Sequence, residues 1–265
     1  MSGFKPMKAG DFNVDNVKFS PVKKLDNGAN IIYTNYDSGS IYIQSPELDI
    51  PFDSGTFFED KPGTGKCPVK VSLKSHDTEG SIKDFHDKIG EFDNYIKKMA
   101  KENSVAWFKK KNMSAETIDN LYTPMLKVSV DSETGEPNGK YPPQFTFKVV
   151  KRDHKVLCKC YDSDKNLLNV EDTEQEDYKS LEDLLKKGSK VRMLLKCNGL
   201  WIAGGKFGCT WKAEQVKIKA APGFTDYAFL EDSDEEDTHQ KIDSSFVESS
   251  DDEGEELSRT VSVRK

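Results

Sequence analysis

The chain has 265 residues, of which 35% are hydrophobic and 32% are charged, and its formal net charge is −7. This length is sufficient for one large or two small domains, and the polar composition indicates a folded core with additional unstructured segments. No run of about 18 apolar residues occurs, which excludes a helical membrane span. The N-terminus lacks the apolar core of a signal peptide, so we expect a protein that is not secreted.

The N-terminal third of the sequence predicts β-strands. Residues 29–36 and 40–45 flank a short turn of Asp, Ser and Gly, which is the pattern of a β-hairpin. In residues 69–73, valine and leucine alternate with lysine and serine, as in a strand with one buried face. These elements indicate a sheet that begins near the N-terminus.

One helix is predicted with a continuous apolar face. From Ile82 to Met99, apolar side chains recur at intervals of three and four positions, which is the period of an amphipathic helix. Ser81 stands where an N-cap belongs. Residues 115–121 and 180–187 are weaker helix candidates. We expect a helical insertion around residues 81–121 within a domain that is otherwise rich in strands.

The second half of the sequence returns to strands. Apolar and polar residues alternate in residues 126–130, 145–149 and 191–197, and a turn-rich loop separates the first two segments. Short strands with interposed helices and long loops favour an elaborated β-barrel or β-sandwich. We assign this domain to residues 1–222.

The C-terminal segment is strongly acidic. Residues 231–265 contain thirteen Asp and Glu against four Lys and Arg, a net charge of −9, so the rest of the chain carries +2. Few apolar residues are available for burial, and residues 223–265 are therefore predicted to form a disordered acidic tail. Three serines of this tail precede acidic residues and are candidate phosphorylation sites: Ser233, Ser249 and Ser250.

The sequence contains no recognisable metal, cofactor or catalytic motif. The five cysteines are odd in number and the four histidines lack metal-binding spacing, which favours reduced thiols in the core. Residues 162–173 begin like a calcium-binding loop but lack its glycine and its final glutamate. Residues 61–68 lack the spacing of a phosphate-binding loop. We therefore expect no metal, no cofactor and no enzymatic activity.

Residues 199–219, GLWIAGGKFGCTWKAEQVKIK, combine aromatic rings, lysines and glycines in one strand-like run. The pair Gly204 and Gly205 predicts a tight hairpin. In the second strand of that hairpin, aromatic residues and lysines alternate, which places them on opposite faces. A bulge near residues 213–215 would keep the apolar face continuous to the end of the strand.

Two interpretations of this run are open. In the first, Trp201 and Trp211 belong to the core, and the lysines only keep the outer face soluble. In the second, rings beside lysines form a groove for single-stranded nucleic acid, with cations for the phosphates and flat rings for the bases. Residues 104–112, SVAWFKKKN, repeat the pattern. The candidate nucleic-acid-binding residues are Trp201, Lys206, Phe207, Trp211 and Lys212, followed by Lys148, Arg152, Arg192, Lys109, Lys110 and Lys111.

The run from Ser189 to Ile218 also resembles the C-terminal signature of the single-stranded-DNA-binding proteins of large nucleocytoplasmic DNA viruses, which are related to short OB-fold proteins of tailed phages. The matching residues are Gly199, Leu200, Trp201, Lys206, Phe207, Gly208, Thr210, Trp211, Lys212 and Gln215. The resemblance implies a mainly β fold with inserted helices, an elaborated OB-fold barrel, no catalysis and an acidic C-terminal tail that contacts replication proteins. The phage tails end on an aromatic residue, whereas this chain ends SRTVSVRK.

Together these features predict a protein that binds single-stranded DNA without sequence preference during viral genome replication, recombination or repair. RNA is an alternative ligand, because stacking and charge do not read the sugar. A different class of function is a non-catalytic scaffold, in the virion or at replication sites, that binds basic partners through the acidic tail. The expected location is the host cytoplasm or nucleus at sites of viral replication, or the virion.

Overall fold

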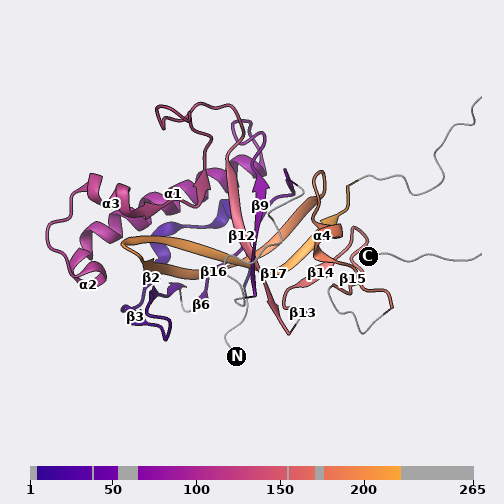
Figure 1. Ribbon diagram of the computed structural model, residues 1–265, viewed down its shortest axis with the longest axis horizontal. Coiled ribbons are helices and arrows are strands. Elements are labelled where there is room, and N and C mark those ends of the chain that lie inside the picture. Colours follow the sequence, from indigo (N-terminus) through magenta and orange to yellow (C-terminus); the bar gives the residue numbers. More distant parts are fainter. Residues whose placement is uncertain (1–4, 38, 53–64, 154, 171–175, 222–265) are drawn as a thin grey trace, which may run out of the picture. The chain divides into compact units, whose positions relative to one another are not determined.

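The computed structural model describes residues 5–37, 39–52, 65–153, 155–170 and 176–221, and its fold is mainly β with inserted helices (Figure 1). The helices are α1 (Ser81–Glu102), α2 (Ser104–Phe108), α3 (Ala115–Leu121) and α4 (Leu181–Leu184), with two 3-10 turns, η1 (Ala9–Asp11) and η2 (Val14–Asn16). The strands are β1 (Met7–Lys8), β2 (Val17–Phe19), β3 (Lys23–Lys24), β4 (Asn30–Ile32), β5 (Thr34–Tyr36), β6 (Gly39–Ser40), β7 (Tyr42–Gln44), β8 (Leu48–Asp49), β9 (Lys66–Ser72), β10 (Tyr122–Thr123), β11 (Leu126–Lys127), β12 (Gln144–Arg152), β13 (Lys155–Val156), β14 (Lys159–Tyr161), β15 (Leu167–Leu168), β16 (Lys190–Ala203) and β17 (Lys206–Lys219).

Five strands of the main sheet follow one another in a ring. β8 pairs with β9, β9 with β12, β12 with β17, β17 with β16, and β16 returns to β8. All of these pairings are antiparallel except that between β12 and β17, which is parallel. Two of these pairings are short: β8 and β9 pair only through Asp49 and Ser72, and β12 and β17 only through Lys148 and Lys212. The architecture is therefore a partly open, OB-like barrel, in agreement with the expected fold class.

The longest element of the barrel is the β16–β17 hairpin. Ala203 pairs with Lys206, so the turn consists of Gly204 and Gly205, and both have positive φ, 59° and 75°. Two consecutive positive φ angles favour glycine and give a turn whose twist matches that of the strands. Leu194 faces Gln215 while Leu195 faces Ala213, which leaves one extra residue in β17. The bulge predicted near residues 213–215 is therefore confirmed.

The apolar seam of α1 packs against the inner face of the sheet. The ring of Phe85 meets that of Phe145 on β12 at 5.3 Å, and Phe92 meets Trp211 on β17 at 6.3 Å, both with edge-to-face geometry. These four aromatic side chains are almost completely buried. The predicted helix is confirmed, but Gly80 occupies the N-cap position and Ser81 is the first helical residue.

Other local predictions were partly wrong. The strand expected over residues 126–130 ends at Lys127, because Val128 and Val130 are half exposed and have no sheet against which to pack. The helix expected over residues 180–187 is the short α4, whose N-cap is the side chain of Ser180. α2 is a helix that the sequence analysis did not predict. By contrast, α3 covers the predicted residues 115–121.

The chain divides by its internal contacts into residues 1–223 and residues 224–265. The acidic tail predicted over residues 223–265, with Ser233, Ser249 and Ser250, lies outside the described residues. Within the described part, all five cysteines are free thiols. A search of the same part finds no helix with the length and apolar character needed to cross a membrane.

Candidate nucleic-acid interface

The two faces of β17 have different environments. Phe207 and Trp211 point inward and are 0% and 1% exposed, because they pack against Phe108 and against Phe92 of α1. A ring without exposed surface cannot stack on a base. The prediction that Phe207 and Trp211 belong to the binding face is therefore wrong, and for these two rings the core interpretation holds. The lysines of β17 lie on the opposite, outer face.

The outer face carries a row of lysines in register across neighbouring strands. Lys148 of β12 faces Lys212 of β17, and Lys212 also faces Lys196 of β16. Lys196 in turn faces Tyr42 of β7. Adjacent strands lie about 4.8 Å apart, so three lysines and one tyrosine follow one another across four strands. We call Lys148, Lys212 and Lys196 the lysine row.

Two more cationic pairs lie along the same hairpin. Arg192 faces Lys217, and Lys190 faces Lys219. Like charges placed directly opposite each other on a sheet destabilise it. A hairpin that repeats this arrangement has a surface suited to a polyanion, because an anionic ligand would relieve the repulsion.

Part of this positive charge is balanced within the protein. The ammonium group of Lys212 lies 2.8 Å from a carboxylate oxygen of Glu214, the bulge residue, and that of Lys190 lies 3.6 Å from Asp49. The Lys196 ammonium lies over the ring of Tyr42, 5.4 Å from its centroid, which is cation–π geometry. The Glu214 carboxylate therefore offsets part of the charge of Lys212 within the lysine row.

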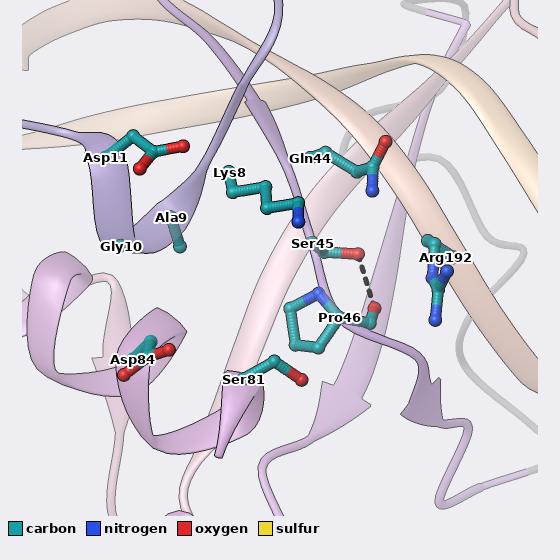
Figure 2. Close-up of a pocket in the computed structure, with 10 residues that line it drawn as sticks. All are labelled: Lys8, Ala9, Gly10, Asp11, Gln44, Ser45, Pro46, Ser81, Asp84 and Arg192. Carbon is teal, nitrogen blue, oxygen red and sulfur yellow. Dashed lines mark hydrogen bonds between the residues drawn. The ribbon is translucent and has the colours of Figure 1, made fainter.

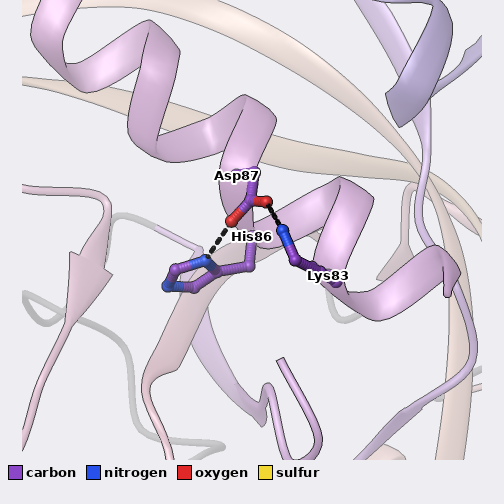
Figure 3. Close-up of polar contacts among 3 residues, drawn as sticks. All are labelled: Lys83, His86 and Asp87. Carbon is purple, nitrogen blue, oxygen red and sulfur yellow. Dashed lines mark hydrogen bonds and ion pairs between the residues drawn. The ribbon is translucent and has the colours of Figure 1, made fainter. Parts of the chain in front are cut away.

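The lysines of α1, in contrast, are accompanied by acids. Lys83 and His86 both contact the carboxylate of Asp87 (Figure 3), and these hydrogen bonds, led by that from Lys83, hold the pKa of Asp87 below its usual value. Lys88 lies 2.7 Å from Glu91 one turn further on. The lysines of this helix surface are thus paired with acids of the same helix, whereas on the sheet lysines stand opposite one another.

Trp201 of β16 lies on the same outer face as the lysine row. It pairs with Gly208 of β17, and a Cβ on Gly208 would come within 3.0 Å of the Trp201 ring and of the Thr123 carbonyl oxygen. Glycine therefore leaves the room that the Trp201 ring occupies. Trp201 is half-buried, so the residue keeps some accessible surface. Gly208 and Lys212 are four residues apart, about 13 Å along the strand, a distance that a few nucleotides can span.

A buried polar contact fixes the strand beside Gly208. β10 runs parallel to β17, and Tyr122 of β10 donates its hydroxyl proton to Asp93 of α1. The backbone N–H of Met125 also donates to this carboxylate, at 3.2 Å. Burial raises the pKa of Asp93, although the hydrogen bonds from Tyr122 and Met125 act in the opposite direction. Burial and the neighbouring carboxylate raise the pKa of Tyr122 as well.

The remaining predicted cations do not all join the lysine row. Lys206, Lys109 and Lys110 line a hollow beside α2, and Lys111 is exposed next to it. Arg152 is exposed at the far end of β12, where that strand turns into β13. Of the eleven candidate residues, Lys148 and Lys212 stand in register in the lysine row, and Trp201 lies on the same outer face.

Arg192 lines a separate cavity of about 360 Å³ (Figure 2). Lys8 and Gln44 lie on the sheet side of this cavity, and Asp11 and Asp84 lie on its helical side. The two carboxylates oppose the two cations. This cavity is therefore less suited to a polyanion than the lysine row is.

The sequence indicates Lys196 as a further cation of a flanking strand, because the alternation of β16 places it on the same face as Arg192. The candidate set nevertheless omitted Lys196, and it also omitted Tyr42. Tyr42 is distant in the sequence, and its register with Lys196 depends on the tertiary pairing of β7 with β16. No local pattern contains that information.

Residues 69–231 match the model of a family described as "Family of unknown function (DUF5871)". The match covers more than half of the chain. The chain belongs to this family. The matched segment begins within β9 and contains the later barrel strands and the inserted helices. It therefore includes the lysine row and Trp201. No curated protein sequence matches the chain.

Several solved structures are similar to this one. The C-terminally truncated single-stranded DNA-binding protein from bacteriophage Enc34 shares 14% identity at a TM-score of 0.41, over 78% of this chain and 97% of that chain. The same phage protein in complex with ssDNA shares 12% at 0.38, with the same coverage of both chains. Gp2.5, a single-stranded DNA-binding protein encoded by bacteriophage T7, shares 15% at 0.36, over 78% and 100%.

Proposed function

We propose that the protein binds single-stranded DNA, without sequence preference, on the outer face of its β16–β17 hairpin. The observation that carries this proposal is the lysine row, in which Lys148, Lys212 and Lys196 stand in register on three adjacent strands. Such a row offers successive cations to a phosphate backbone that crosses the strands. Binding through phosphates makes no distinction between base sequences.

Trp201 supports a single strand rather than a duplex as the ligand. A partly exposed indole beside a cationic row can stack on an unpaired base, and every base offers a flat face. In a duplex the bases are already stacked and paired, so the ring would have no free partner. Stacking on aromatic side chains contributes about 1–3 kcal/mol per base, which is enough to favour the single strand.

On this proposal the protein is not an enzyme. Its role would be to cover and organise exposed strands during viral genome replication, recombination or repair, in the host cytoplasm or nucleus. The segment 231–265, with its net charge of −9, would contact replication proteins and would compete with DNA for the same cations. Phosphorylation of serines in that segment would strengthen the competition.

A fluorescence titration with a thymidine oligomer at several salt concentrations tests the proposal. We expect tryptophan fluorescence to fall on binding, and the logarithm of the affinity to fall linearly with the logarithm of the salt concentration. A uridine oligomer of the same length measures the preference between DNA and RNA. If neither oligomer binds at low salt, nucleic-acid binding is excluded and a scaffold role becomes the better explanation.

A further inference from the structure

A second cationic surface lies at the tip of the β16–β17 hairpin. It is a hollow of about 380 Å³ between α2, the β3–β4 hairpin and the turn of β16–β17. This volume falls in the range of small-ligand sites, roughly 300–1,000 Å³. Four lysines from three separate segments surround it: Lys24, Lys109, Lys110 and Lys206. The two segments in which the sequence pairs aromatic residues with lysines meet here.

The wall of the hollow is aromatic and held in place. Trp107 of α2 is 6% exposed and packs edge-on against Phe19 at 5.2 Å and Phe108 at 6.2 Å. Phe108 is held in turn by the buried ring of Phe207, at 5.0 Å. Ile202 of β16 contributes a further apolar side chain. The hollow therefore offers a rigid apolar wall to a flat ligand.

The charges of the hollow favour an anion. No Asp or Glu is among the described residues that line it, so its four lysines have no carboxylate inside the hollow. Asn30 adds one side-chain amide, which can both donate to and accept from the edge of a base. An apolar wall, one amide and a cationic rim together match a base with its phosphate.

The hollow is continuous with the proposed DNA-binding face through β17. Lys206 lines the hollow and lies on the same strand face as Lys212, six residues away, or about 20 Å along the strand. At about 3.4 Å per nucleotide in a stacked strand, roughly six nucleotides would cover this distance. This continuity favours a nucleotide of a bound strand over an acidic peptide, which the lysines alone would also accept.

We propose that the hollow holds one nucleotide, base and phosphate together, of the same DNA strand that lies on the lysine row. The inference rests on the proposed function and extends it, because the strand would pass around the hairpin tip. A thymidine tetramer on the lysine row is then too short to reach the hollow, and a thymidine dodecamer reaches it.

The experiment compares these two oligomers on single variants of the full-length chain. Lys110→Gln removes a lysine of the hollow, and its neighbour Lys111→Gln, which does not line the hollow, is the matched control. Ile202→Trp fills the hollow without changing the charge, and a thermal melt checks that it folds. We expect Lys110→Gln and Ile202→Trp to weaken dodecamer binding about five- to tenfold, the lower end of the range for the contacts of one nucleotide. Tetramer binding should stay unchanged, and Lys111→Gln should behave like the wild type with both oligomers.

A spectroscopic readout comes from Trp201→Phe, which leaves Trp107 and the buried Trp211 as the remaining tryptophans. The dodecamer should still quench the tryptophan fluorescence of this variant, and the tetramer should not. If the wild type binds both oligomers and the hollow variants match the Lys111→Gln control, the nucleotide site in the hollow is excluded. DNA binding on the lysine row is then unaffected. If the wild type binds neither oligomer, both proposals fail. If a glutamate dodecamer binds in a Lys110-dependent way without displacing the thymidine dodecamer, the hollow is a peptide site and this inference is wrong.

Discussion

Lys196 and Lys212 face each other across the β16–β17 hairpin, and Lys212 faces Lys148 on its other side. This arrangement costs stability, because like charges directly opposite each other repel. A bound anion would relieve this repulsion, so the same arrangement would favour the binding of a polyanion. Stability and binding should therefore respond in opposite directions when the row is altered.

The first prediction uses this opposition. Lys196→Glu places a carboxylate opposite Lys212 and should raise the free energy of unfolding by about 0.5 kcal/mol, a typical value for a cross-strand charge pair. The same change should weaken DNA binding strongly. Chemical denaturation and a titration of the same sample measure both quantities. The matched control is Lys70→Glu, because Lys70 faces the uncharged Thr146. A variant that loses both stability and binding would indicate a structural role for Lys196.

The second prediction separates the two tryptophans of the hairpin. Trp211→Ala removes a fully buried ring and should lower the free energy of unfolding by about 3–5 kcal/mol. Trp201→Ala removes a half-buried ring, so it should cost less stability and abolish the quenching caused by a thymidine tetramer. Thermal melts and titrations of both variants give the comparison. If Trp201→Ala keeps full affinity and full quenching, the outer face is not the stacking surface.

The third prediction concerns the space beneath Trp201. Gly208→Ala adds a Cβ at 3.0 Å from both the Trp201 ring and the Thr123 carbonyl oxygen. We expect a loss of about 1–3 kcal/mol in stability, as for overpacking, together with weaker quenching by DNA. Gly39→Ala is the control, because no neighbouring atom lies within 4 Å of its added Cβ. Unchanged quenching in Gly208→Ala would show that the position of the Trp201 ring does not matter.

The fourth prediction is a pH dependence at Asp93. Its pKa is raised by burial, so above its usual value of about 4 the folded state holds a proton that the unfolded state has released. The contribution of Asp93 to stability is therefore full below that pH and is lost as the pH rises through the folded-state pKa. Asp93→Asn keeps an oxygen that accepts from Tyr122 and Met125 and does not titrate. Its stability relative to the wild type should rise with pH over this window.

Asp131→Asn is the control of opposite sign. Backbone hydrogen bonds from Thr134 and Glu133 hold the pKa of Asp131 below its usual value. Its contribution is present above the unfolded pKa and is lost as the pH falls, so the relative stability of this variant should decrease with rising pH. Denaturation curves at several pH values measure both differences. Parallel trends in the two variants would contradict the assignment.

The fifth prediction concerns the acidic segment. A chain ending at residue 222 lacks the net charge of −9 carried by residues 231–265, and should bind single-stranded DNA more tightly at low salt. The gain should shrink as salt screens the competition. Titrations of full-length and truncated protein at two salt concentrations give the answer. Equal affinities at low salt would leave the segment only a recruiting role.

Local patterns predicted much of the fold. The seam of α1, the turn at Gly204 and Gly205 and the bulge in β17 follow from residue periods and from glycine geometry, which are properties of neighbouring residues. The strand period also separated Phe207 and Trp211 from the lysines of β17. The error lay in assigning both faces of one strand to one ligand, because the inner face packs on α1 and α2.

The remainder of the site depends on register between distant strands. Lys148 meets Lys212 through the parallel contact of β12 with β17, and Tyr42 meets Lys196 through β7 and β16. The hollow beside α2 likewise joins segments far apart in the chain. Such pairings follow from closure of the whole barrel, and no single segment encodes them.

The salt dependence of binding tests the central claim most directly. Each lysine of the row that contacts a phosphate should contribute about 0.7 to the slope of log affinity against log salt for a single strand. The triple variant with Lys148, Lys196 and Lys212 changed to Gln should therefore have a slope shallower by about 2 than the wild type. A triple variant of α1, with Lys88, Lys98 and Lys101 changed to Gln, should keep the wild-type slope. If the two triple variants have equal slopes, the lysine row is not where the protein binds DNA.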